Sequence, residues 1–205
     1  NEHVTSSMDT ALEPLRLANG PIIKSVTNLD GPPGIESQQD ADSAALQVIN
    51  IIKRNNSADA FVIACFSDPG IYAAREVTNK PVFGIAESGI LTALSLGSSF
   101  GILAILDTSV PRHVRYVRSL GLEKRLAGDL AIGLGVAELS DEKKTFHRLL
   151  EVGRKLRDNH EASVLILGCA GMARYRHNLQ ESLGIPVVDP SQAAVSMAVS
   201  AVLLN

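Results

Sequence analysis

The chain has 205 residues, of which 45% are hydrophobic and 20% are charged, the proportions of an ordinary globular protein. Its net charge of −3, the absence of tryptophan and an aromatic content of 4% exclude the basic, base-stacking surface of a nucleic-acid-binding protein. The apolar runs are too short to span a membrane, no leader segment is visible, and two cysteines do not make a disulfide framework. We therefore expect a cytoplasmic protein that contacts neither nucleic acid nor membrane.

The chain opens with a helical pattern, whereas a doubly wound domain normally opens with a strand. Apolar residues recur at helical spacing over residues 1–18, with Asn1 or Thr5 as a candidate cap. A strand is predicted over 21–27. Glycine and proline then indicate a loop over 28–37, and a helix is expected over 38–54.

From residue 60 onward, predicted strands alternate with predicted helices. The strands are short apolar runs over 60–65, 81–86, 100–105, 126–134, 163–168 and 185–188. The helices cover 69–78, 87–98, 111–120, 140–159, 174–183 and 190–203. This alternation predicts an α/β fold with parallel sheets covered by helices on both faces.

A weak internal repeat divides the chain. Cys65 and Cys169 each end an apolar strand, and each is followed by a helix, a Pro-Val strand and an acidic residue, Glu87 or Asp189. The repeat predicts two similar Rossmann-like halves related by a pseudo-two-fold, with the active site in the cleft between them. Approximate boundaries place 1–88 with 190–205 in the first half and 89–189 in the second.

The two cysteines are candidate catalytic groups because the carboxyl ends of parallel strands are where α/β proteins bind ligands. A single cysteine in such a place is more often a small core residue. Two in matching places, each before a helix, favour thiolates whose pKa is lowered by backbone N–H groups and the helix dipole. A disulfide would be unusual in the cytosol, and no histidine lies at a metal-ligand spacing from either cysteine. The histidines are expected mostly at the surface; they are His3, His113, His147, His160 and His177.

Two thiols on opposite faces of one carbon suit stereoinversion. One, as the thiolate, would remove a Cα proton, and the other, as the thiol, would return a proton from the far side. The resulting carbanion needs hydrogen-bond donors at its oxyanion. The backbone N–H groups of Phe66, Ser67, Ala170 and Gly171 are candidates for this role.

Several motifs along the chain resemble the hydantoin/allantoin racemase branch of the aspartate/glutamate racemase superfamily. They are Ile-Ala-Cys-Phe-Ser-Asp-Pro-Gly at 63–70, Leu-Gly-Cys-Ala-Gly-Met at 167–172, Gly-Pro-Pro-Gly-Ile-Glu-Ser at 31–37, Pro-Val-Phe-Gly-Ile-Ala-Glu at 81–87 and Pro-Val-Val-Asp at 186–189. Together they span nearly the whole chain.

The resemblance implies a cofactor-independent, metal-free racemase that forms a homo-oligomer, either a tetramer or a hexamer. Cys65 and Cys169 match the acid/base cysteines of that branch. The expected substrate-binding residues are Pro33, Gly34, Ile35, Phe66, Ser67, Glu87, Thr108, Ala170 and Gly171. The branch also has a first strand ending in Asn-Pro-Asn-Ser/Thr, and this chain is expected to begin just after that point.

The residues beside the cysteines bear on the substrate. Amino-acid racemases of the superfamily carry Cys-Asn-Thr and Gly-Cys-Thr where this chain has Cys-Phe-Ser and Gly-Cys-Ala. Phe66 and Ala170 lack the donors that suit a free carboxylate, so a neutral 5-monosubstituted hydantoin or allantoin is favoured. The alternatives are an amino-acid racemase of the aspartate/glutamate type, a decarboxylase of the same fold, and a non-catalytic small-molecule sensor.

Three acidic residues have both a structural and a functional interpretation. Glu36 either caps the helix from residue 38 or orients substrate, and capping is slightly favoured. Asp68 and Asp189 are expected to be helix caps and not catalytic groups.

Overall fold

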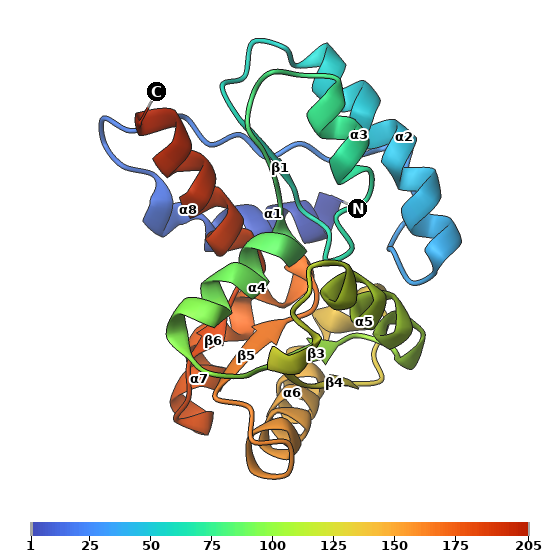
Figure 1. Ribbon diagram of the computed structural model, residues 1–205, viewed down its shortest axis with the longest axis vertical. Helices are drawn as coiled ribbons and strands as arrows, with labels where there is room; N and C mark the ends of the chain where they lie inside the picture. Colours follow the sequence, from blue (N-terminus) through green and yellow to red (C-terminus); the bar gives the residue numbers. More distant parts are fainter. Residues whose placement is uncertain (1, 205) are drawn as a thin grey trace.

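Two parallel sheets form the framework of the chain, of which the computed structural model describes residues 2–204 (Figure 1). The larger sheet has the order β4-β3-β5-β6 and the smaller one pairs β1 with β2. The strands are β1 (Phe61–Ile63), β2 (Val82–Gly84), β3 (Phe100–Ala104), β4 (Leu126–Ala131), β5 (Val164–Leu167) and β6 (Val187–Val188). The predicted α/β fold with parallel sheets is confirmed.

Helices cover both faces of the larger sheet. They are α4 (Ile85–Leu96), α5 (Val110–Ser119), α6 (Glu142–Asp158) and α7 (Arg176–Leu183). Phe100 and Ile102 of β3 pack into a core shared with α4 and α5, whereas Leu165 and Leu167 of β5 pack into a core shared with α6 and α7. Strand side chains alternate between faces, so continuous apolar strands are what a sheet buried on both sides requires. No helix within residues 2–204 is long and apolar enough to cross a membrane.

The smaller sheet has its own core with α2 (Gln38–Arg54) and α3 (Ile71–Glu76). The buried members of that core are Ile52, Ile63, Ile71, Ala74 and Val82. The last helix, α8 (Pro190–Leu203), returns from the larger sheet and packs against β1, β2 and α4. The division of the chain at residues 88 and 189 remains a prediction.

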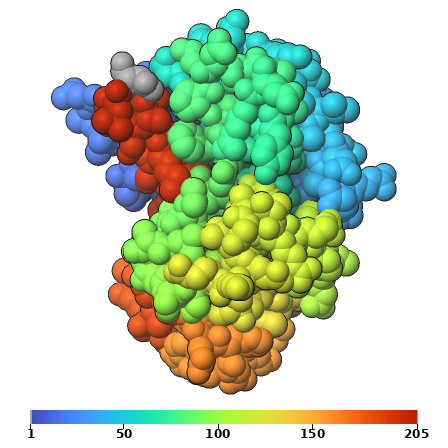
Figure 2. All heavy atoms as spheres, viewed as in Figure 1, coloured from blue at the N-terminus to red at the C-terminus, as the bar shows by residue number. Residues whose placement is uncertain are grey.

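The first helix is shorter than predicted. α1 (Glu2–Ala11) gives way to a 3₁₀ turn at Glu13–Leu15, because Pro14 cannot donate the helical hydrogen bond. The candidate cap Asn1 lies outside the described residues. Gln192 of α8 donates to the Ala11 carbonyl at 2.6 Å, and Figure 2 shows the blue N-terminal segment against the red C-terminal helix.

The predicted strand over residues 21–27 is wrong. The segment contains no strand or bridge residue, and Ile22 is 96% exposed. Side chains hold it instead, since Ser25 donates to the Asp9 carboxylate and Thr27 donates to Thr5 of α1. A strand needs a neighbouring edge to pair with, and an alternating sequence does not reveal whether one is present.

Other element boundaries shift by a few residues. α3 begins at Ile71, after Gly70 in the left-handed conformation (φ 73°), so Pro69 lies in the preceding turn and not at the first helical position. The helix predicted over 174–183 is preceded by a 3₁₀ stretch, η5 (Ala170–Tyr175), which starts directly after Cys169. A second such stretch, η4 (Val136–Ser140), follows the end of β4.

Asp68 links the turn after β1 to the start of α4 by hydrogen bonds. Its two carboxylate oxygens accept from the backbone N–H groups of Ala86 and Glu87, both at 2.9 Å, and one of them also accepts from the Tyr116 hydroxyl at 2.9 Å. The predicted capping role is therefore confirmed, although the capped helix is α4 and not the adjacent α3. Burial raises the pKa of Asp68 to about 6, against the lowering effect of these bonds.

Asp68 gives folding stability a specific pH dependence. Its pKa is about 6 in the folded chain and has an ordinary value of 3.8, so the folded state holds this proton more tightly. The stability that Asp68 contributes is full below about pH 4 and is lost as the pH rises to about 6, at up to about 1.4 kcal/mol per pH unit. In urea titrations, the difference in unfolding free energy between wild type and Asp68→Asn should therefore shrink between about pH 4 and about pH 6.

An exposed aspartate provides the control for this measurement. Asp30→Asn makes the same change of side chain at an exposed position and is titrated in parallel. Burial also raises the pKa of Asp189 to about 6, so the readout is the difference between proteins and not the wild-type curve alone. A difference for Asp68→Asn that is independent of pH would contradict the assignment.

Candidate active site

Cys65 and Cys169 line one cavity of about 720 Å³. Cys65 follows β1 by two residues and Cys169 follows β5 by two residues, so each lies just beyond the carboxyl end of a parallel strand. Both thiols are free and half-buried. The two cysteines that the repeat singled out, from different sheets, therefore line one cavity.

The turn after Cys65 is tightly hydrogen-bonded. The N–H groups of Ser67 and Asp68 both donate to the Cys65 carbonyl, at 2.8 and 3.0 Å. Asp68 itself is in the left-handed region (φ 43°), which aspartate tolerates better than most residues. The Ser67 N–H is consequently engaged within the turn. It is therefore not free to donate to a ligand oxyanion, which is the role that the sequence had suggested for it.

Cys169 lies at the cap position of η5, in an extended conformation. The backbone N–H of Gly171 bonds to its thiol and favours the thiolate form. The preceding residue must be glycine, because a Cβ at Gly168 would lie 2.5 Å from the backbone oxygen of Leu103 in β3. Close packing of β5 on β3 thus places the cysteine.

Burial dominates the electrostatics of both thiols. It raises the pKa of Cys65 to about 12, helped by the proximity of Cys169 and Asp68 and opposed by Arg112 and the backbone N–H of Ser67. It raises the pKa of Cys169 to about 11, with Gly171 opposing and Glu36 adding to the rise. The expectation that helix starts would lower these pKa values is wrong, because α3 begins only at Ile71 and η5 is a short 3₁₀ turn.

The Gly/Pro loop before α2 closes the cavity from the side of Cys169. Pro33, Gly34 and Ile35 line it, as predicted. Glu36 does not cap α2, whose start is held by a reciprocal capping box of Ser37 and Asp40. Its carboxylate instead accepts from the backbone N–H of Val136, the first residue of η4, at 2.9 Å.

The remaining predicted site residues divide into two groups. Phe66, Ser67 and Ala170 line the cavity, whereas Glu87, Thr108 and Gly171 are not among its lining residues. The Glu87 carboxylate pairs with Arg75 at 2.6 Å. The Thr108 hydroxyl donates to the Glu36 carbonyl at 3.1 Å, so it supports the loop that closes the cavity.

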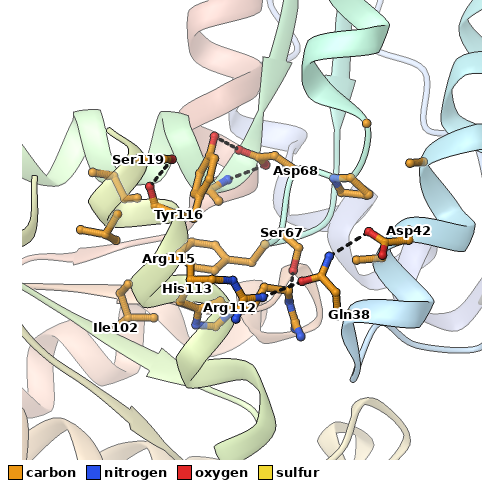
Figure 3. A pocket seen from close by; sticks show the side chains of 18 residues that line it. Gln38, Asp42, Ser67, Asp68, Ile102, Arg112, His113, Arg115, Tyr116 and Ser119 are labelled. Atoms are coloured by element: carbon orange, nitrogen blue, oxygen red, sulfur yellow. Dashed lines mark hydrogen bonds between the residues drawn. The ribbon is translucent and has the colours of Figure 1, made fainter. Parts of the chain in front are cut away.

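α5 contributes cavity residues that sequence reasoning missed. Arg112 and His113 line the main cavity and also a second, outer cavity of about 300 Å³ (Figure 3). The histidines are mostly exposed, as expected, and His113 is the buried exception; its Nδ1 lies 2.9 Å from the Asp129 carboxylate, and the Phe66 ring packs edge-on against it. The pattern of α5, with arginines at 112, 115 and 118, resembles a solvent-exposed helix and gave no signal of burial.

The start of α8 also borders the cavity. Asp189 caps this helix by accepting from the Ser191 N–H at 2.9 Å, which confirms its predicted role. The second oxygen of Asp189 and the hydroxyl of Ser191 are buried without a hydrogen-bond partner, and Ser191 lines the cavity. Within the described part of the chain, no three His, Cys, Asp or Glu side chains gather as a metal site would require.

Comparisons with known proteins identify the family and the fold of the chain. The family model described as Asp/Glu/Hydantoin racemase matches residues 1–198. A hydantoin racemase from Pseudomonas sp. (strain NS671) is 38% identical over 171 residues, which are 82% of this chain and 69% of that protein.

Two solved structures match almost the whole chain. An allantoin racemase from Klebsiella pneumoniae superposes with a TM-score of 0.89 at 31% identity, over 98% of this chain and 83% of that one. An allantoin racemase from Pseudomonas fluorescens superposes with a TM-score of 0.93 at 27% identity, over 99% and 87% respectively. The chain therefore belongs to the Asp/Glu/Hydantoin racemase family, within its hydantoin and allantoin racemase branch.

Proposed function

We propose that the protein is a cofactor-independent racemase that inverts the Cα of a 5-monosubstituted hydantoin or of allantoin. The observation that carries the proposal is that Cys65 and Cys169, from the ends of two different sheets, line the same cavity. Such a pair can exchange protons with one substrate carbon from its two opposite faces. The family to which the chain belongs and the names of its relatives support this reaction class.

The proposed reaction is a proton transfer between two thiols. One cysteine, as the thiolate, takes the Cα proton and becomes a thiol, while the electron pair delocalises into the neighbouring ring carbonyl. The other cysteine, as the thiol, gives its proton to the opposite face of the carbanion and becomes the thiolate. The site therefore keeps one negative charge throughout, and the two roles exchange for the other enantiomer.

The lining of the cavity favours a neutral ring over a free amino acid. Its apolar residues include Pro33, Ile35, Phe66, Val136 and Ala170, beside the polar Ser67 and Arg112. A ring carbonyl acidifies the adjacent Cα–H, so the base needs less strength than it would with an ionised amino acid. The Phe66 ring is buried and offers an apolar surface on the Cys65 side.

Cys65→Ser and Cys169→Ser are each expected to reduce racemisation of a 5-monosubstituted hydantoin by at least about 10²-fold, because a serine hydroxyl is too weak an acid to replace either thiol. Chiral chromatography of both enantiomers measures this, with the enzyme-free rate subtracted. Ser95→Ala, an exposed change outside the cavity, should leave the rate unchanged. If either cysteine variant racemises at the wild-type rate, the two-thiol proposal fails.

A panel of ligands separates the proposed substrate class from its alternatives. At concentrations well above their dissociation constants, hydantoins and allantoin should raise the melting temperature of the protein, because ligand that binds only the folded state stabilises it. Free aspartate and glutamate should not. Protection by aspartate alone would support the amino-acid racemase instead, and protection by ureides without any racemisation would support the small-molecule sensor.

The homo-oligomeric assembly and the cytoplasmic location also remain proposals. They rest on the family resemblance and on the composition of the chain, respectively.

A further inference from the structure

The geometry points to Arg112 as the cation that stabilises Cys65 in its thiolate form, and thus as a positioning residue for proton transfer. This inference rests on the proposed function, since only a reacting Cys65 needs to ionise. It adds a charged group from the larger sheet's helix α5 to a cysteine that belongs to the smaller sheet.

Arg112 is held directly behind the turn that follows Cys65. Its side chain is buried, with the residue 9% exposed, and it lines both the main cavity and the outer one. Its Nε donates to the Ser67 hydroxyl at 2.9 Å, as Figure 3 shows, and Nη2 lies 3.5 Å from the Ser109 hydroxyl. The guanidinium is therefore bonded to the residue two positions after Cys65, and it borders the cavity that Cys65 also lines.

No carboxylate within residues 2–204 lies within ion-pairing distance of Arg112, although twelve other ion pairs occur there. A buried cation without a partner costs several kcal/mol of solvation free energy. Neutral hydroxyls compensate only part of that cost. The Cys65 thiolate would supply the missing negative charge, so the cost of burying each ion is reduced when both are present.

Other charged groups around the pair are already engaged elsewhere. Asp68 binds the start of α4 and Tyr116, and Asp129 of β4 pairs with His113. Asp40 of α2 is half-buried and bonded to Ser37, and Arg115 of α5 is exposed and donates to Gln38.

The last charged group, Glu36, lies on the side of the other cysteine. Its carboxylate raises the pKa of Cys169, and Cys169 in turn disfavours a second thiolate at Cys65. Repulsion of this kind penalises whichever thiol ionises second, so it does not prevent the first ionisation. Among the groups that affect the pKa of Cys65, the Arg112 cation and the backbone N–H of Ser67 lower it, against burial, Cys169 and Asp68, and Arg112 is the charged one.

Thiol alkylation tests the inference without any substrate. Iodoacetamide reacts with the thiolate, so the rate at a fixed pH of about 9 reports the ionised fraction of each cysteine. Arg112→Gln should lower the rate at Cys65 by about tenfold or more, which corresponds to a pKa rise of about one unit. The rate at Cys169, read from its own peptide by mass spectrometry, should change much less.

Two further variants keep the test decisive. Arg115→Gln removes an exposed arginine one turn along the same helix and should leave both rates unchanged. Arg112→Lys keeps the charge without the planar fork, so its Cys65 rate should lie nearer to wild type than to Arg112→Gln. If Arg112→Gln does not fold, the lysine variant decides alone: a tenfold loss at Cys65 despite the retained charge would overturn the electrostatic role.

The outcome is independent of whether the substrate has been named correctly. An unchanged Cys65 rate in folded Arg112→Gln overturns the inference even if the protein racemises hydantoins. A selective loss at Cys65 supports it even if no ureide is turned over. With an active substrate, the same variant should also shift the acid limb of the pH–rate profile upward, because the thiolate then forms only at higher pH.

Discussion

The parallel pairing of β3 with β5 determines where the chemistry of this protein can take place. The two strands are so close at their carboxyl ends that only glycine fits at position 168, against the Leu103 backbone. The chain leaves β5 at that point and turns into η5, which places Cys169 above the sheet edge. The chain likewise leaves β1 of the smaller sheet just before Cys65. The cavity is lined by residues at the carboxyl ends of both β1 and β5.

The same burial that encloses the cavity opposes the ionisation that catalysis would require. Both thiols have raised pKa values, because apolar surroundings disfavour the charged form. An enzyme that works by two thiols must offset this cost locally. Here the Gly171 N–H lowers the pKa of Cys169, and the Ser67 N–H and the Arg112 guanidinium, which pairs with no carboxylate of residues 2–204, lower that of Cys65.

The fold and the two cysteines could be predicted because their signals are local. A short apolar run that ends in Gly-Cys or Ala-Cys predicts a buried strand that stops at the cysteine. Two such runs at matching places in a repeat predict one shared site. Glu36 could not be assigned in this way, since its partner Val136 is 100 residues away. Arg112 was missed for the same reason: its burial depends on Ser67, 45 residues earlier, and not on the helix that carries it. The absent strand at 21–27 shows the reverse error, in which a suitable pattern has no neighbouring edge to pair with.

The most direct test of the two-sided mechanism is where deuterium appears during racemisation in D₂O. If one enantiomer of a 5-monosubstituted hydantoin is supplied and the reaction is stopped early, the product enantiomer should carry deuterium at Cα while the recovered substrate keeps its protium. That pattern requires one group to remove the proton and a different, solvent-exchanged group to return one from the opposite face. Equal deuterium in recovered substrate and product from the earliest times, after subtraction of the enzyme-free exchange, would show a single base and contradict the account.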